Sequence, residues 1–305
     1  MYTTLIEPEE LAAPLSRNAS ADSDGNGRRW AVIDCRFDLA RPEWGAAAYA
    51  AGHIPGALYA HLDHDLSGPI SPSSGRHPLP SLARLAATFD RWGINEKVQV
   101  VAYDQGNGAY AARLWWLLRW AGHRPVAVLN GGFTAWQQAA LPVETALIDL
   151  TPARTSGQAF IPHPVEGAVV STAELERMLS AGEPGSGASM LVDARSADRF
   201  AGENETIDPV AGHIPGAHSH PFLGNVDARG RFLPASELRG RWQTTLGDLA
   251  AARVISMCGS GVTACHNLLA LEIAGLPGAR LYAGSWSEWI RDPGRPVARG
   301  TPSET

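Results

Sequence analysis

Short apolar runs alternate with longer segments whose apolar positions recur at helical spacing, and each half of the chain shows this order. A short apolar run with polar boundaries is typical of a buried strand. The pattern of the first half predicts strands at 30–34, 98–103 and 126–129, and helices at 109–121 and 133–138. The pattern of the second half predicts strands at 190–193, 253–257 and 280–282, and a helix at 262–274. The alternation predicts an α/β fold in which each half has a mainly parallel sheet with helices on both faces.

The chain also repeats its motifs at a separation of about half its length. Ala-Gly-His-Ile-Pro-Gly-Ala at 51–57 recurs at 211–217, and Asp-Cys-Arg at 34–36 corresponds to Asp-Ala-Arg at 193–195. So long a period predicts a duplicated domain, not a solenoid. The predicted domains are 1–145 and 166–305, joined by a proline-containing linker at 146–165.

A run of small residues lies between the predicted strand 253–257 and the predicted helix 262–274. It reads Cys258-Gly259-Ser260-Gly261-Val262. Glycines let backbone N–H groups turn toward one point, and these donors and the helix dipole favour a thiolate. The alternative is an inert buried cysteine, against which the two glycines argue. Asp104 takes the matching position of the first half, where a carboxylate cannot carry a transferable sulfur atom.

These motifs together resemble the two-domain sulfurtransferases of the rhodanese superfamily. The resemblance runs from about Ile6 to about Arg291 and includes the closing run Gly-Ser-Trp-Ser-Glu-Trp at 284–289. The loop 258–263 is similar to that of 3-mercaptopyruvate sulfurtransferases, whereas thiosulfate sulfurtransferases usually carry basic residues after the cysteine. The resemblance implies a persulfide on Cys258, which passes its sulfur to cyanide or to a thiol such as that of thioredoxin. It implies no metal and no organic cofactor.

The resemblance also assigns a donor-binding arginine. Arg199 matches the arginine that binds the substrate carboxylate in the mercaptopyruvate enzymes, and a guanidinium suits a planar carboxylate because it donates two parallel bonds. The family supplies a second arginine a few residues on, but 202–208 contains no basic residue here. Arg76 is a candidate replacement, with a solvated loop arginine as the alternative. Ser260 is expected to hydrogen-bond the ketone or the departing sulfur, with a small loop residue as the alternative.

Further residues are expected around the donor. The loop residues expected to bind the donor are Gly259, Gly261, Val262 and Thr263, although a cap of the helix is favoured over a chemical role for Thr263. The repeated His53 and His213 are expected to fix the loops that follow helices, although His53 is also a candidate to face Cys258 across the domain interface.

Composition and charge exclude several function classes. A formal charge of −6 argues against a nucleic-acid partner. Three cysteines without metal-ligand spacing argue against a disulfide framework and a zinc site, and predict a reducing, cytoplasmic location. The N-terminal residues lack the pattern of a signal peptide, and the longest apolar stretch, 114–121, is too short to cross a membrane.

Three other functions stay open on the sequence. The same cysteine could take sulfur from thiosulfate. A phosphatase is a second class, because cell-cycle dual-specificity phosphatases resemble this fold, but they need a longer loop that ends in an arginine, and 259–266 contains none. The third is a non-catalytic sulfur-carrier or regulatory module, against which Cys258 and its glycines argue.

Overall fold

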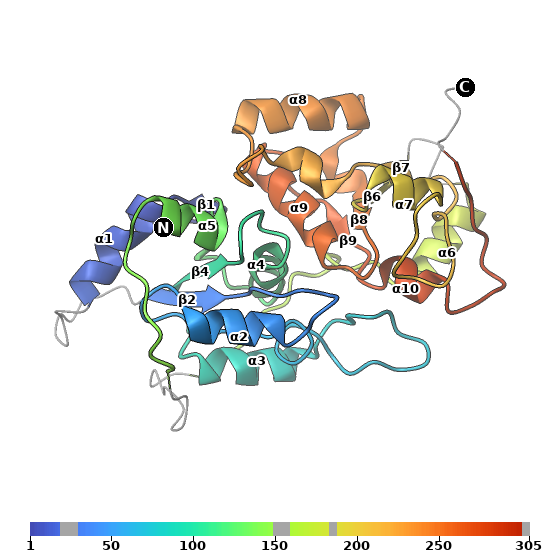
Figure 1. Ribbon diagram of the computed structural model, residues 1–305. Coiled ribbons are helices and arrows are strands. Elements are labelled where there is room, and N and C mark those ends of the chain that lie inside the picture. Colours follow the sequence, from blue (N-terminus) through green and yellow to red (C-terminus); the bar gives the residue numbers. More distant parts are fainter. Residues whose placement is uncertain (19–29, 149–158, 183–187, 301–305) are drawn as a thin grey trace. The chain divides into compact units, whose positions relative to one another are not determined.

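The chain forms two compact units, described by a computed structural model over residues 1–18, 30–148, 159–182 and 188–300 (Figure 1). Unit 1 consists of Met1–Gly68, Pro80–Val165 and Ala228–Phe232, and unit 2 of Pro69–Leu79, Glu166–Asp227 and Leu233–Thr305. The boundary between the units lies at 165/166, so unit 1 also includes the described ends of the predicted linker, and two short segments each pack in the unit formed by the other half. The middle of the predicted linker, 149–158, lies outside the described residues.

Unit 1 is built on a parallel sheet of five strands in the order β1-β5-β4-β2-β3. The strands are β1 (Leu5–Ile6), β2 (Trp30–Asp34), β3 (Leu58–Tyr59), β4 (Gln99–Tyr103) and β5 (Val126–Leu129). The helices are α1 (Pro8–Asn18), α2 (Trp44–Ala51), α3 (Leu82–Arg91), α4 (Ala111–Trp120) and α5 (Gly132–Gln138). The central strand β4 is buried along its whole length, as its run of apolar residues requires when both faces of a sheet are covered.

Unit 2 repeats this topology with four parallel strands in the order β7-β6-β8-β9. The strands are β6 (Met190–Asp193), β7 (His218–Ser219), β8 (Val254–Met257) and β9 (Arg280–Leu281). Val169 forms a parallel bridge with Leu281 and so takes the place that β1 has in unit 1. The α-helices are α6 (Thr172–Ser180), α7 (Ala197–Ala201), α8 (Ala235–Leu246), α9 (Thr263–Ile273) and α10 (Ser285–Trp289), and 3₁₀ turns lie at η1 (Phe222–Asn225) and η2 (Ala251–Arg253). The predicted duplicated α/β fold is confirmed.

The predicted elements agree with the observed ones to within one or two residues at each end. The exception that concerns chemistry is Thr263, which is the first residue of α9, while Val262 holds the N-cap position. The expectation that Thr263 caps this helix is therefore wrong. The amphipathic helix α3 was not predicted, although Ser81 accepts a hydrogen bond from the Arg84 N–H at its start, as an N-cap serine does.

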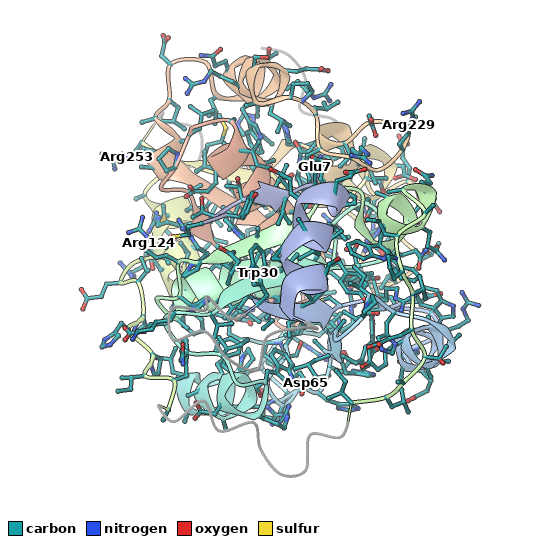
Figure 2. The ribbon with its side chains drawn as sticks, turned by 90° about the vertical axis from the view of Figure 1, so that its left-hand side faces the viewer. Glu7, Trp30, Asp65, Arg124, Arg229 and Arg253 are labelled. Atoms are coloured by element: carbon teal, nitrogen blue, oxygen red, sulfur yellow. The ribbon has the colours of Figure 1, made fainter. Side chains whose placement is uncertain are left out.

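The segment Ala228–Phe232 is anchored in unit 1 by hydrogen bonds and an ion pair. The Phe232 N–H donates to Asn130 Oδ1 at 2.9 Å, and Asn130 Nδ2 donates to Glu7 Oε1 at 2.7 Å. Arg231 Nη1 lies 2.5 Å from Glu7 Oε2, and Glu7 stands beside the first turn of α1 (Figure 2). Five residues of the second half thus cover the carboxyl end of β5, which Asn130 follows.

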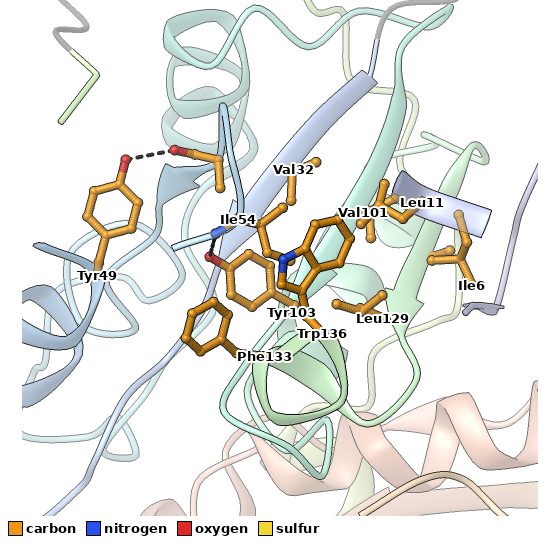
Figure 3. Packing of buried hydrophobic residues seen from close by; sticks show 12 residues of the cluster. Ile6, Leu11, Val32, Tyr49, Ile54, Val101, Tyr103, Leu129, Phe133 and Trp136 are labelled. Carbon is orange, nitrogen blue, oxygen red and sulfur yellow. Dashed lines mark hydrogen bonds between the residues drawn. The ribbon is translucent and has the colours of Figure 1, made fainter. Parts of the chain in front are cut away.

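The core of unit 1 is aromatic beside the carboxyl ends of its strands (Figure 3). Tyr103 and Phe133 stack with ring centroids 6.0 Å apart, and Trp136 packs in the same cluster. The Ile54 N–H donates to Tyr103 Oη at 3.3 Å, and Tyr49 Oη donates to the Ala57 carbonyl at 2.7 Å. The first bond ties the repeated Gly-His-Ile-Pro-Gly-Ala turn to β4, and the second ties it to α2.

The duplicated histidines have matching contacts in the two units. His53 stacks on Tyr49 with centroids 3.9 Å apart, and its Nδ1 lies 2.8 Å from the Tyr49 carbonyl oxygen. His213 stacks on Phe200 at 3.8 Å, and its Nδ1 lies 2.9 Å from the Phe200 carbonyl oxygen. Both rings are buried. Helix anchoring therefore accounts for the repeated motif, while a role of His53 toward the donor stays a prediction.

Candidate active site around Cys258

Cys258 directly follows β8, an interior strand of the second sheet, and is 2% exposed. The Trp286 N–H donates to the Cys258 carbonyl at 3.0 Å, and the Ser287 N–H donates to the Gly259 carbonyl at 2.8 Å. Because α10 binds these carbonyls, the N–H groups of the loop turn toward the sulfur. Cys258 Sγ accepts from the Gly261 N–H at 3.1 Å and from the Ser260 N–H at 3.5 Å. The loop thus surrounds the sulfur with donors that suit a thiolate.

The two glycines of the loop are accommodated for different structural reasons. Gly261 has a φ of +77°, and an added Cβ would lie 2.3 Å from the Ala283 carbonyl oxygen, so only glycine fits. Gly259 lies outside the left-handed region, and an added Cβ would meet Arg76 Nη2 at 3.4 Å and Arg199 Nη2 at 3.6 Å. Gly261 therefore shapes the backbone, whereas Gly259 leaves room beside two guanidinium groups.

The matching loop of unit 1 carries its own anion. Asp104 Oδ1 accepts from the N–H groups of Gly106 and Gly108, both at 3.0 Å. Its Oδ2 accepts from the N–H groups of Tyr110 at 2.9 Å and Ala111 at 3.2 Å. Burial raises the pKa of Asp104, and these four amides oppose the rise. The loop that presents a sulfur in unit 2 is filled by a carboxylate in unit 1.

Arg199, on α7, is held by two carboxylates. Its Nη2 donates to Glu205 Oε1 at 2.8 Å, and its Nε donates to Glu205 Oε2 at 3.1 Å. The same Nη2 lies 3.2 Å from Asp208 Oδ2. Burial opposes the shift, but hydrogen bonds from Arg199 and from the Asp208 and Ile207 amides lower the pKa of Glu205. Arg199 is thus oriented before any donor binds.

Arg76 belongs to the first-half segment that packs in unit 2. Its Nη1 lies 2.7 Å from Asp208 Oδ1, and its backbone N–H donates to Ser287 Oγ at 3.0 Å. Its Nε is buried and has no hydrogen-bond partner among the described residues. Arg76, Arg199 and Gly259, all predicted as donor-binding residues, therefore lie together. The carboxylates that hold the two arginines were not predicted.

Ser260 also has a partner that sequence reasoning missed. Its Oγ lies 2.7 Å from His77 Nδ1, and both side chains are buried. Since His77 follows Arg76, the same first-half segment supplies a guanidinium and an imidazole to unit 2. The adjacency to Arg76 was the available signal, but nothing local in the sequence tied this segment to Ser260.

The arginines beside the loop belong to a longer ionic chain within unit 2. Arg195 Nη2 lies 2.7 Å from Asp193 Oδ2, and Arg195 Nη1 lies 3.3 Å from Glu205 Oε2. Burial opposes the shift, but Asp193, Glu205 and Cys258 raise the pKa of Arg195. Six groups of alternating charge result, in the order Asp193, Arg195, Glu205, Arg199, Asp208, Arg76. The chain runs from a fully buried carboxylate to a guanidinium that is 27% exposed.

The other two cysteines are packed in their units. Cys35 is buried after β2, and burial raises the pKa of its thiol. Cys265 lies in α9, and its Sγ donates to the Gly261 carbonyl at 3.3 Å. Both thiols are buried, as is typical of structural cysteines.

Across the described ranges, no group of three or more His, Cys, Asp or Glu side chains could hold a metal ion. None of the helices in the described part of the chain is long and apolar enough to cross a membrane.

Comparisons with known proteins agree over most of the chain. The family model of the rhodanese-like domain matches residues 8–139 and 171–292. A Pseudomonas aeruginosa protein named "Probable 3-mercaptopyruvate sulfurtransferase" is 49% identical over 271 residues, or 88% of this chain and 92% of that protein. The thiosulfate sulfurtransferase of Cricetulus griseus is 32% identical over 299 residues, or 95% and 93%. The structure of 3-mercaptopyruvate sulfurtransferase from Leishmania major matches with a TM-score of 0.79 and 29% identity, covering 94% of this chain and 74% of that one.

Proposed function

The chain belongs to the rhodanese family and is a sulfurtransferase, and from this premise we propose that it takes sulfur from 3-mercaptopyruvate as a Cys258 persulfide. The observation that carries the donor assignment is the pair of guanidinium groups beside Gly259. Arg76 and Arg199 each have an Nη2 within 3.6 Å of the space that a Gly259 side chain would fill. Two guanidiniums at such spacing suit a carboxylate next to the sulfur nucleophile.

The first half-reaction forms an S–S bond and breaks a C–S bond. The Cys258 thiolate attacks the sulfur of 3-mercaptopyruvate, and the electron pair of the broken bond stays with carbon as the enolate of pyruvate. The proton of the donor thiol balances the enolate, which becomes pyruvate. The Gly261 and Ser260 N–H groups stabilise the charge on sulfur before and after transfer, because they already point at Sγ.

Ser260 and His77 act on the ketone side of the donor. With His77 Nδ1 2.7 Å from Ser260 Oγ, the hydroxyl can donate toward the developing enolate oxygen while the imidazole exchanges the proton. Positioned proton transfer of this kind typically contributes about 10²–10⁴-fold to rate.

The second half-reaction regenerates the Cys258 thiolate. A thiolate acceptor, such as that of thioredoxin, attacks the outer sulfur of the persulfide, and Cys258 leaves as a thiolate. Cyanide takes the same sulfur and leaves as thiocyanate. We place this reaction in a reducing cytoplasm, where three unpaired thiols persist and acceptor thiols are abundant.

Thiosulfate is the second candidate donor, because the curated relatives include a thiosulfate sulfurtransferase. Thiosulfate releases sulfite, which needs no proton on a ketone oxygen. The pair Ser260 and His77 therefore favours 3-mercaptopyruvate over thiosulfate as the donor. A phosphatase and a non-catalytic module are disfavoured, since the loop lacks an arginine and keeps a cysteine surrounded by donors.

Cyanolysis with each donor tests the proposal. Wild-type protein is expected to form thiocyanate with a higher kcat/KM for 3-mercaptopyruvate, and mass spectrometry is expected to find one added sulfur atom on Cys258. Cys258→Ser should lose both signals, while Cys265→Ser, a matched change of a buried thiol, keeps most of the turnover. Substantial turnover in Cys258→Ser would overturn the mechanism, and a wild-type preference for thiosulfate would overturn the donor assignment.

A further inference from the structure

Asp208 lies between the two guanidinium groups beside Gly259. Each of its carboxylate oxygens meets one guanidinium, Oδ1 at 2.7 Å from Arg76 and Oδ2 at 3.2 Å from Arg199. Two arginines would hold the carboxylate of a keto acid in this way. Its side chain is only 2% exposed, and Oδ2 lies 3.7 Å from the Cβ position of Gly259. The donor site thus contains a negative charge of its own.

This carboxylate changes the charge that a donor meets. Arg76 and Arg199 carry two positive charges, and Glu205 and Asp208 carry two negative ones, so the four side chains sum to zero. Glu205 faces inward to Arg195, whereas Asp208 borders Gly259. Asp208 is therefore the negative charge that a donor approaches directly.

We propose that Asp208 selects the donor by its charge and disfavours dianions such as thiosulfate relative to monoanions. The proposal rests on the function proposed above. At a separation of about 6 Å and an effective dielectric constant of about 40, one unit of charge on Asp208 changes the affinity roughly tenfold for each unit of donor charge. Asp208 thus lowers the affinity for a dianion about ten times more than the affinity for a monoanion.

Two donors of the same chemistry isolate this effect. Thiosulfate is a dianion, and methanethiosulfonate is a monoanion with the same kind of terminal sulfur. Each gives a Cys258 persulfide when its S–S bond breaks and the electron pair leaves with sulfite or methanesulfinate. The ratio of their kcat/KM values in cyanolysis reports donor charge and cancels defects in the cysteine or in the acceptor step.

Asp208→Asn removes the charge and keeps the shape. The thiosulfate to methanethiosulfonate ratio is expected to rise about tenfold over that of the wild type. Asp208→Glu restores the charge and should return the ratio toward the wild-type value. Glu203→Gln is the matched control, because it removes the same charge from an exposed position of the same loop, and its ratio should stay within about twofold of the wild type. If Asp208→Asn does not fold, Asp208→Ser replaces it.

A purely structural role for Asp208 would lower both kcat/KM values together and leave the ratio unchanged. An unchanged ratio in a folded Asp208→Asn protein therefore overturns the proposal, as does an equal rise in Glu203→Gln. A wild type without cyanolysis from any donor would instead overturn the proposed function. The two failures can be distinguished, because the first is an unchanged ratio in an active protein and the second is an absence of turnover in the wild type.

Discussion

Gly261→Ala is the most direct test of how the loop activates Cys258. The backbone φ of +77° costs a residue with a Cβ roughly 1–2 kcal/mol. The new Cβ would also lie 2.3 Å from the Ala283 carbonyl oxygen, a contact that a backbone atom cannot relieve without movement. The loop must shift, and the Gly261 N–H, 3.1 Å from Cys258 Sγ, is the group that shifts with it.

The expected loss follows from that hydrogen bond. A hydrogen bond to a charged group contributes about 1.5–3 kcal/mol, which corresponds to roughly a ten- to hundredfold lower rate of persulfide formation. The loss of rate should be similar for 3-mercaptopyruvate and thiosulfate, because the Gly261 N–H contacts the cysteine and not the substrate. Stopped-flow measurement of persulfide formation gives the rate, and urea denaturation gives the change in stability.

Gly259→Ala is the matched control within the same loop. Its backbone accepts a side chain, and the added methyl would lie 3.4 Å from Arg76 Nη2. This variant should keep the wild-type stability and raise the KM for donors while kcat changes less. A Gly261→Ala protein that is within about threefold of the wild type in rate would refute the role of the loop amides.

Three further predictions concern other parts of the site and the fold. Asp104→Asn leaves two of four buried N–H groups facing an amide NH₂, so the free energy of unfolding should fall by about 1–3 kcal/mol in urea denaturation. The rate of cyanolysis should stay unchanged, and a loss of activity in a folded variant would contradict a catalytically silent unit 1. Ser260→Ala and His77→Ala should each lower kcat with 3-mercaptopyruvate about tenfold or more and affect thiosulfate less, and equal losses with both donors would contradict proton transfer to the ketone. Burial lowers the pKa of His123 and of His220 to about 4, below the ordinary value near 6.5, so the stability from each neutral ring is complete above pH ~6.5 and falls by up to about 3 kcal/mol as the pH drops to 4. Urea denaturation at these two pH values should show a smaller drop in the free energy of unfolding for His123→Leu than for the wild type, and an equal drop would contradict this cause.

Local patterns sufficed for the longer strands and for the cysteine loop, but not for the two-residue strands β1, β3 and β7. The strand 254–257 is a run of buried residues, and the loop glycines signal a turn of the backbone, so both follow from residues close in sequence. The duplication allowed each prediction in one half to be checked in the other. Asp104 was correctly placed in the matching loop for the same reason.

Long-range charge pairing was beyond the sequence patterns. The segment 202–208 was recognised only as lacking a second arginine, whereas its two carboxylates, Glu205 and Asp208, hold Arg199. No periodicity links Arg76 to Asp208, which lies 132 residues further on. Such pairs form because burial makes an unpaired charge costly, and that requirement acts only once the chain has folded.

The placement of residues 69–79 in unit 2 bears on how this gene duplication has been preserved. A half without the nucleophilic cysteine would be free to degenerate or disappear if it served only as a scaffold. Here the first half encodes Arg76 and His77, which contact Asp208 and Ser260 in the unit that holds the cysteine. Selection on sulfur transfer therefore reaches into the half that lacks the nucleophile, and a gene fragment encoding only residues 166–305 would inherit Cys258 without these two side chains.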